Sequence, residues 1–236
     1  MVVNKPAGLV VHPGCGNTHG TLINAVAWHL KDNPDFDAND PQVGLVHRID
    51  KNTSGLLVVA KTAYAKAFLG QQFFNKTTRR TYNALVWGAL KDDTGTIVGN
   101  ITRNPRNRLQ MAVSSDDSVG KHAVTHYRVL ERMSYVSLVE CNLETGRTHQ
   151  IRAHLASQNH PIIGDYKYGN RKVNDQYKEK YNLQSQLLHA YRLEMPKLEN
   201  ELSNMSEKHF VAPITTLFDK INVILGGNIY EINRYS

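Results

Sequence analysis

The segment from His47 to Gly55 reads HRIDKNTSG and concentrates chemically active side chains in nine residues. Asp50 is its one carboxylate, and a carboxylate can act as a nucleophile or as a general base. The basic residues Arg48 and Lys51 lie beside it, together with two hydroxyls and a glycine. An ordinary surface turn that carries an Asp–Lys pair is the alternative interpretation of this segment.

Apolar runs enclose this polar segment on both sides. Leu45-Val46 precedes it and Leu56–Ala60 follows it. Short β-branched runs bounded by polar residues and Gly are typical of strands. The sequence therefore predicts a loop held between two strands, and binding and catalytic residues concentrate in such loops.

Periodicity and turn signals predict the remaining elements. Apolar spacing indicates helices over 21–30, 63–75 and 214–225, and Thr148 is a candidate cap for a helix that carries Ile151, His154 and Leu155. Residues 31–42 and 170–186 are polar and are expected to lack regular structure. Strands are expected at 2–3, 9–12, 81–87, 95–101, 111–113, 123–132, 135–143 and 188–193. This succession predicts an α+β fold with a large, mostly antiparallel sheet and flanking helices.

Length and composition limit the class of protein. The chain has 236 residues, 41% hydrophobic and 21% charged, which fits a globular protein of one large domain or two small ones. We expect a single domain over residues 1–236. It contains no run of the roughly 18–20 apolar residues that a membrane span needs. No signal peptide is recognisable, and Cys15 and Cys141 are too few for a disulfide scaffold. We therefore expect a cytoplasmic protein without membrane association.

The charge balance favours a polyanionic partner. The formal net charge is +7 and the sequence pI is about 9.3. Basic domains of this kind approach phosphates. Solvated charges around an unrelated pocket are the alternative. The basic residues are scattered along the chain in loops and at element ends: Lys76, Arg79, Arg80, Arg103, Arg106, Arg108, Arg147, Arg152, Lys167, Arg171 and Lys172.

A metal site does not fit the spacing of the histidines. His149 and His154 lie five residues apart, whereas helical metal pairs prefer a spacing of about four. No carboxylate stands at the matching position of this helix. His12, His47 and Asp50 are the other conceivable ligands. We expect no metal, and the histidines are expected to bond loops or to stack near the polyanionic partner.

Four strings in order give the chain a family resemblance. The segment 47–55 resembles the HRLD-x-x-TSG signature of RluA/RluD-type pseudouridine synthases, and residues 4–14 resemble their first block. Residues 145–152 match the TGRTHQIR block, and Leu188-His189-Ala190 matches the LHA strand. The match is closest to the RluD branch, which modifies 23S ribosomal RNA. It implies the pseudouridine synthase fold, with a central cleft.

The resemblance implies specific roles at this chain's positions. Asp50 stands where the family has its catalytic aspartate, which isomerises uridine to pseudouridine without a cofactor. Arg147 corresponds to the arginine that pairs with this aspartate, and an adjacent guanidinium keeps a carboxylate ionised. Tyr82 corresponds to a tyrosine that stacks on the target base. Arg48 corresponds to an arginine that helps to displace that base from the RNA stack.

Further residues are candidates for the RNA-binding surface. Leu193 is expected to form an apolar wall under the base. The other candidates share a position near the motifs or in basic segments: His47, Lys76, Arg79, Arg80 and Arg152.

Departures from the family pattern leave a second hypothesis open. Ile49 replaces the usual Leu, and the chain starts almost at the first motif, so we expect no upstream S4-like RNA-binding domain. The first hypothesis is an enzyme that acts on structured RNA, most simply 23S ribosomal RNA in an assembling large subunit, as a monomer. The alternative is a catalytically idle RNA-binding or ribosome-assembly factor on the same fold. A metal-dependent hydrolase fails on ligand spacing.

Overall fold

Four helices of the described residues begin after a residue whose side chain caps the helix. The computed structural model describes residues 1–14, 16–34 and 44–227. Helix α1 (Leu22–Leu30) follows Thr21, which exchanges hydrogen bonds with Asn24 in a capping box. The same kind of cap precedes three further helices, each accepting a backbone N–H near its start: Thr62 before α2 (Ala63–Phe74), Asn170 before α4 (Arg171–Tyr181) and Thr215 before α5 (Thr216–Ile224).

The chain divides into two units, and two of the three boundaries fall inside strands. Unit 1 comprises Met1–Arg80 and Ala190–Ala212, and unit 2 comprises Thr81–His189 and Pro213–Ser236. Each unit is described by itself below. One catalytic domain over residues 1–236 therefore stays a prediction.

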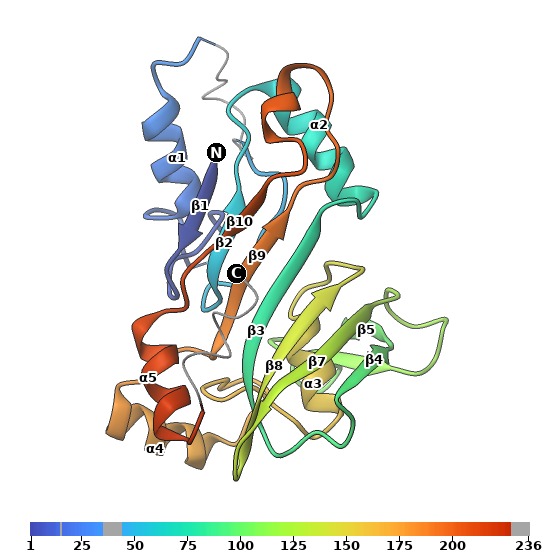
Figure 1. Cartoon of the computed structure of the whole chain (residues 1–236), viewed down its shortest axis with the longest axis vertical. Coiled ribbons are helices and arrows are strands. Elements are labelled where there is room, and N and C mark those ends of the chain that lie inside the picture. The colour runs from blue at the N-terminus through green and yellow to red at the C-terminus, as the bar shows by residue number, and fades with distance from the viewer. Residues whose placement is uncertain (15, 35–43, 228–236) are drawn as a thin grey trace. The chain divides into compact units, whose positions relative to one another are not determined.

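Unit 1 is built on antiparallel strands. Strand β1 (Val2–Lys5) pairs with β2 (Ser54–Val58), which places Lys5 opposite Gly55. Strand β9 (Leu188–Glu194), which enters this unit at Ala190, is the other neighbour of β2 and pairs with β10 (His209–Val211). Figure 1 shows β1 and β2 side by side, and the unit also contains the 3-10 helix η1 (Asn200–Met205).

The close approach of two backbones in unit 1 requires a glycine. Gly55 has φ +107°, and a Cβ built on it would lie 2.3 Å from the carbonyl oxygen of Ala190. Any larger residue would separate β2 from β9. The apolar core beside them contains Leu56, Val58 and Leu69.

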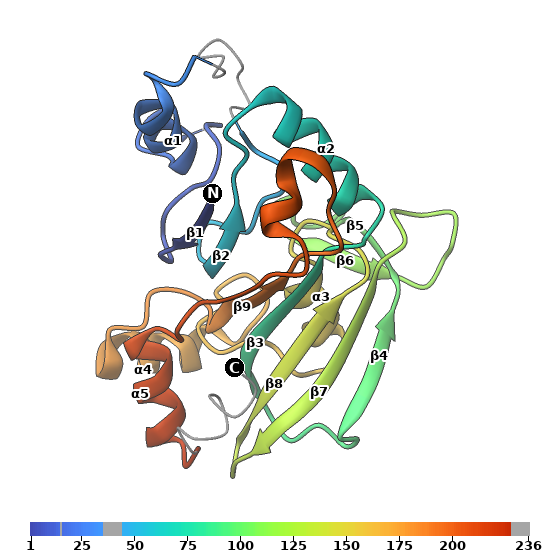
Figure 2. The ribbon, with the colours of Figure 1, turned by 45° about the horizontal axis from the view of Figure 1, so that its top comes forward.

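Unit 2 contains a four-stranded antiparallel sheet. The strands β3 (Arg79–Trp87, from Thr81 on), β8 (Val136–Leu143), β7 (Val124–Arg132) and β4 (Thr94–Val98) lie in this order. Figure 2 shows them running next to one another. An apolar core joins the sheet to α4 and α5, with Leu85, Leu138 and Phe218 among its fully buried members.

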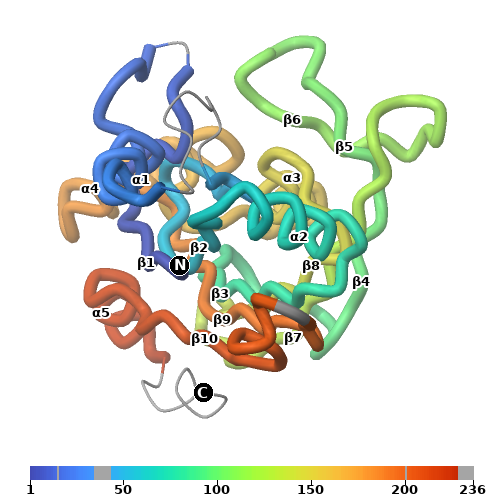
Figure 3. Tube along the Cα trace, turned by 90° about the horizontal axis from the view of Figure 1, so that it is seen from above, coloured from blue at the N-terminus to red at the C-terminus, as the bar shows by residue number. Residues whose placement is uncertain are grey.

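A separate hairpin adds a basic loop to unit 2. Strands β5 (Asn100–Arg103) and β6 (Met111–Ser114) pair antiparallel, and β6 contacts α3 (Gln150–Ser157). The loop between the strands extends away from α3 (Figure 3). Asn104 Oδ1 accepts hydrogen bonds from the backbone of Arg106 and Asn107, which fixes the loop's turn.

The α+β class and the predominance of antiparallel pairing are confirmed. The expected helices at 21–30, 63–75 and 214–225 are also present, each shortened by one to three residues. The strand expected at 9–12 is wrong, because the carbonyls of Val10 and Val11 accept the first N–H groups of α1 instead. Leu45 forms only an isolated bridge, so the described residues 44–46 do not form the strand expected there, whereas β2 begins within the 47–55 segment at Ser54.

Two further local expectations are wrong. Residues 171–181 form α4, whose Tyr177 and Tyr181 pack against the core of unit 2. His149, in a left-handed conformation, precedes helix α3 and makes no capping bond with its side chain, so Thr148 is not the cap of this helix. Part of the polar loop expected at 31–42 lies outside the described residues.

Candidate functional site

The Asp50 carboxylate is carried by a tight turn that leads into β2. The backbone N–H of Thr53 donates to the carbonyl of Asp50 at 3.1 Å, and β2 begins at the next residue. Ile49 is buried, whereas Arg48 is exposed and Asp50 half-buried. The alternation anchors the segment through Ile49 and leaves Arg48 accessible, as its predicted contact with RNA requires.

A buried lysine holds this turn from behind. The side chain of Lys5 is fully buried, with 0% of its surface exposed. Its ammonium donates to the carbonyls of Pro6 (2.9 Å), Leu9 (2.9 Å) and Lys51 (2.8 Å). These three acceptors match the three donors of an ammonium group. Lys5 therefore ties the first strand to the residue that follows Asp50.

Charge links the same lysine to Asp50. Burial lowers the pKa of the Lys5 ammonium to about 8, and the Asp50 carboxylate opposes this shift through its charge. The buried ammonium of Lys5 therefore places a positive charge near Asp50. Residues 4–14, the first string of the family resemblance, contain Lys5, but no role was predicted for it. A lysine that ends a strand begun by Val2-Val3 was the available signal.

His47 serves the structure of unit 1. Its ring stacks on Phe73 with centroids 4.2 Å apart, and its Nε2 accepts a hydrogen bond from the backbone of Val58 at 2.9 Å. Burial, together with the nearby Arg80 cation, lowers the pKa of His47 to about 3. The neutral ring therefore carries its proton on Nδ1. These contacts give His47 an anchoring role, and its contact with RNA stays a prediction.

The depressed pKa of His47 predicts an acid-sensitive fold. Below pH 6.5 the unfolded chain binds a proton that the folded chain takes up only near pH 3. Stability due to neutral His47 is therefore present above pH 6.5 and is lost toward pH 3, by at most about 1.4 kcal/mol per pH unit. The free energy of unfolding is measured by urea denaturation at several pH values between 7 and 4.5. It should fall less steeply with decreasing pH in His47→Gln than in the wild type. The control His29→Gln alters an exposed histidine and should behave as the wild type does. Equal slopes in all three would contradict this assignment.

Tyr82 lies on β3 in unit 2 with 6% of its surface exposed. It stands opposite Cys141 of β8, where burial raises the pKa of the thiol to about 12 and keeps it neutral. The sheet thus fixes the position of the tyrosine ring. Its stacking on a target base stays a prediction.

A glutamine holds the turn that carries Arg147. Buried Gln150 accepts hydrogen bonds from the Arg147 backbone (3.0 Å) and the Thr145 hydroxyl (2.7 Å), and donates to Val124 and Thr125. Arg147 is exposed, and its Nε donates to the carbonyl of His122 at 3.0 Å. Asp50 belongs to unit 1, whereas Arg147 and Tyr82 belong to unit 2. The convergence of these three side chains therefore stays a prediction.

Arg152 forms a buried ion pair. Its Nε and one terminal nitrogen donate to the two carboxylate oxygens of Asp165 at 2.7 and 2.9 Å, and its guanidinium lies over the Tyr168 ring. The side chains of Arg152 and Asp165 are 6% and 0% exposed. The guanidinium neutralises a buried carboxylate, which gives Arg152 a structural role, and its contact with RNA stays a prediction.

Removal of Arg152 is expected to destabilise unit 2 strongly. Arg152→Met leaves the Asp165 carboxylate buried without its counter-charge, which typically costs about 3–5 kcal/mol. The matched variant Arg171→Met removes an exposed arginine 3.9 Å from Asp175 and should cost at most about 0.5 kcal/mol. Urea denaturation followed by circular dichroism measures both. Equal stability of the two variants would refute the structural role of Arg152.

The remaining candidates divide between core and surface. Leu193 is 2% exposed within the apolar core of unit 1, and its predicted role as a wall of the site stays a prediction. Lys76 and Arg79 are exposed, and the half-buried Arg80 places its guanidinium over the Phe73 ring. These three basic residues lie together at the start of β3.

The described part of the chain contains neither a cluster of metal-binding side chains nor a helix that could span a membrane. Within residues 1–14, 16–34 and 44–227, no group of three or more His, Cys, Asp and Glu side chains could hold a metal ion. In the same residues, no helix has the length and apolar character needed to cross a bilayer.

Comparison with known proteins identifies the family. The model of the RNA pseudouridylate synthase family matches residues 1–157, which include the Asp50 turn and Arg147. The chain belongs to this family. A protein of Nitrosomonas europaea named ribosomal large subunit pseudouridine synthase D is 48% identical over 196 residues, covering 83% of this chain and 55% of that protein.

Other relatives agree. A protein of the same name from Neisseria meningitidis serogroup A is 50% identical over 197 residues, covering 82% of this chain and 51% of its own length. This chain thus spans about half the length of such relatives. Among solved structures, human RNA pseudouridylate synthase domain containing 4 has a TM-score of 0.72 at 25% identity, over 95% of this chain and 88% of the human chain.

Proposed function

We propose that this chain isomerises uridine to pseudouridine in ribosomal RNA, with 23S large-subunit RNA as its substrate. The observation that carries the proposal is the identity of about half of the residues to proteins named ribosomal large subunit pseudouridine synthase D, over four fifths of this chain. The chemistry breaks the N1–C1′ bond and forms a C5–C1′ bond. It consumes no oxidant, reductant or water.

In this proposal Asp50 is the reactive carboxylate. Its turn is held in place close to a positive charge. Lys5 supplies a buried positive charge near it and bonds the carbonyl of Lys51. Arg147 pairs with Asp50, and Tyr82 supplies an aromatic face for the extruded uracil. Both belong to unit 2, so the proposal requires that the two units bring these groups together around the RNA.

The RNA-binding surface in the proposal is basic. Arg48, Lys76, Arg79 and Arg80 contribute from unit 1. Exposed Arg103, Arg106 and Arg108 of the hairpin loop contribute from unit 2. Such contacts bind phosphates and position the RNA without reading its sequence. We further propose that the protein acts as a monomer in the cytoplasm.

The deciding experiment is isomerisation of an unmodified transcript. Purified protein is incubated with large-subunit ribosomal RNA made in vitro, and pseudouridine is mapped by carbodiimide treatment and primer extension. New stops at defined uridines, absent without protein, are the expected result. Tight binding of the transcript without any stop would favour the idle RNA-binding factor and refute the enzyme.

A further inference from the structure

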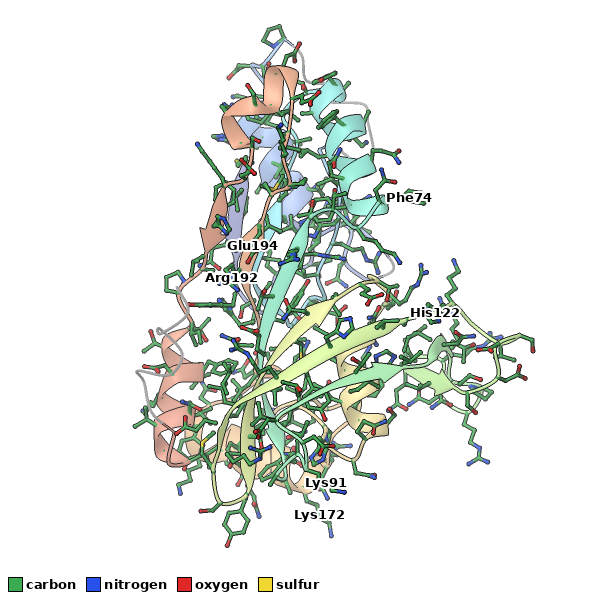
Figure 4. The ribbon with its side chains drawn as sticks, turned by 45° about the vertical axis from the view of Figure 1, so that its right-hand side comes forward. Phe74, Lys91, His122, Lys172, Arg192 and Glu194 are labelled. Atoms are coloured by element: carbon green, nitrogen blue, oxygen red, sulfur yellow. The ribbon has the colours of Figure 1, made fainter. Side chains whose placement is uncertain are left out.

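An aromatic ring at the end of α2 is exposed without a packing reason. Ala65 and Leu69, four residues apart, mark the buried face of this helix. Phe73 is half-buried against His47, but Phe74 is 81% exposed. Figure 4 shows Phe74 at the C-terminal end of α2, directed away from the helix. Phe74 therefore adds nothing to the core of unit 1.

The backbone beneath this ring is fixed. The N–H of Thr77 donates to the carbonyl of Gln72 (3.1 Å), and the N–H of Lys76 donates to that of Phe73 (3.3 Å). These two bonds define a Schellman end, in which Lys76 takes the left-handed conformation (φ +62°) that glycine favours. The Thr77 hydroxyl also donates to the Gln72 side chain at 2.7 Å. A ligand at this end meets side chains on an ordered backbone, which reduces the entropy lost on binding.

The charged residues that neighbour Phe74 in the sequence are all basic. No Asp or Glu occurs between Asp50 and Asp92. Within this interval Lys76 and Arg79 are exposed and follow Phe74 closely. An isolated exposed apolar residue is ordinary. Proteins that bind single-stranded nucleic acid stack its bases on aromatic rings and hold its backbone with cations. Phe74, with basic and no acidic neighbours in the sequence, matches this combination.

The contact between His47 and Phe73 places this end near the reactive turn. His47 lies three residues before Asp50, a span of at most about 11 Å along the chain. The two rings are 4.2 Å apart. The C-terminal end of α2, which carries Phe74, therefore packs against the segment that carries Asp50.

We propose that Phe74 is a stacking platform for an unpaired base that flanks the target uridine, with Lys76 and Arg79 on the adjoining phosphates. This inference rests on the proposed function, because it concerns the same RNA. It adds a contact that requires single-stranded RNA beside the target. RNA whose flanking bases are paired cannot use the platform.

The test compares Phe74→Ala and Phe74→Trp with the matched variant Trp28→Ala, which removes a ring that is 72% exposed on α1 of the same unit. The substrates are a loop-containing fragment of large-subunit ribosomal RNA and a fully paired duplex of equal length. Phe74→Ala should raise the Kd and KM for the loop fragment about tenfold with kcat unchanged, since one stacked base has roughly this worth. Phe74→Trp and Trp28→Ala should resemble the wild type. Duplex binding should be the same in all four proteins.

Binding is also measured without catalysis, so that the two proposals fail separately. In a Trp28→Phe background, the fluorescence of Phe74→Trp should be quenched by the loop fragment. Quenching together with weak binding by Phe74→Ala, in a protein that forms no pseudouridine, would refute the proposed function and support the platform. Wild-type affinity in Phe74→Ala, equal losses on the duplex, or a dimer in sedimentation that Phe74→Ala dissolves would overturn the platform.

Discussion

An Asp50→Asn variant is expected to bind large-subunit ribosomal RNA as the wild type does and to isomerise it at least about a thousandfold more slowly, because the amide can act neither as nucleophile nor as base. The substitution keeps the shape of the side chain. It also leaves the backbone bond from Thr53 to the Asp50 carbonyl intact. The loss should therefore appear in kcat.

Tritium release measures this loss. Attachment of C5 to C1′ displaces the hydrogen of C5, so RNA made with [5-³H]uridine releases label only when it is isomerised. The matched control is Asp32→Asn, which neutralises an exposed carboxylate of the same unit. Full activity of Asp50→Asn would remove Asp50 from the reaction. A parallel loss in Asp32→Asn would point to net charge instead.

The second large effect is expected for Lys5→Met. Methionine fills a similar volume but gives no donor to the carbonyls of Pro6 and Leu9, which the Lys5 ammonium bonds at 2.9 Å. We expect a loss of stability of about 2 kcal/mol, since each hydrogen bond to a charged donor contributes about 1.5–3 kcal/mol and the ammonium no longer has to be desolvated. We also expect kcat to fall about tenfold or more, because general acid–base groups contribute factors of this size only when they are positioned and charged correctly.

The pH profile separates the electrostatic role of Lys5 from a structural one. The folded pKa is about 8, against 10.5 for an ordinary lysine. From pH 8 to 10.5 the unfolded chain binds more protons than the folded chain, so the free energy of unfolding rises with pH. Over the same interval Lys5 loses the positive charge that lies near Asp50 and donates to the Lys51 carbonyl, so activity should fall while stability rises. Lys5→Met should show neither trend, and exposed Lys61→Met should show both. Activity that follows stability in the wild type would leave Lys5 a purely structural residue.

Local sequence predicts those elements whose signal is local. Helix α1 follows from Thr21 and the apolar spacing after it, and α2 follows in the same way from Thr62. Helix α4 was missed because its sequence is mostly charged. The stripe of Tyr177 and Tyr181 gains meaning only from the core that it covers. The strand expected at 9–12 failed since its carbonyls cap α1, a contact between segments that no periodicity reveals.

The same distinction applies to the candidate site. The position of Asp50 in a turn before a strand was predicted from apolar runs and is confirmed for the strand that follows. The buried ion pair of Arg152 was not predicted, because its partner Asp165 lies in another segment. The sequence alone does not reveal which carboxylate a given arginine neutralises. Lys5 was overlooked for the related reason that its three acceptors are backbone carbonyls, which every residue possesses.

The bonds of Lys5 have a consequence for the motion of the chain. The carbonyls it binds belong to residues 6, 9 and 51, and the N–H of Gly8 also donates to the carbonyl of Lys51. If either the N-terminal segment or the turn opens alone, the buried ammonium of Lys5 loses hydrogen-bond acceptors. The two segments should therefore open together, as one cooperative unit in hydrogen exchange. Deleting the first five residues would therefore loosen a turn more than forty residues away.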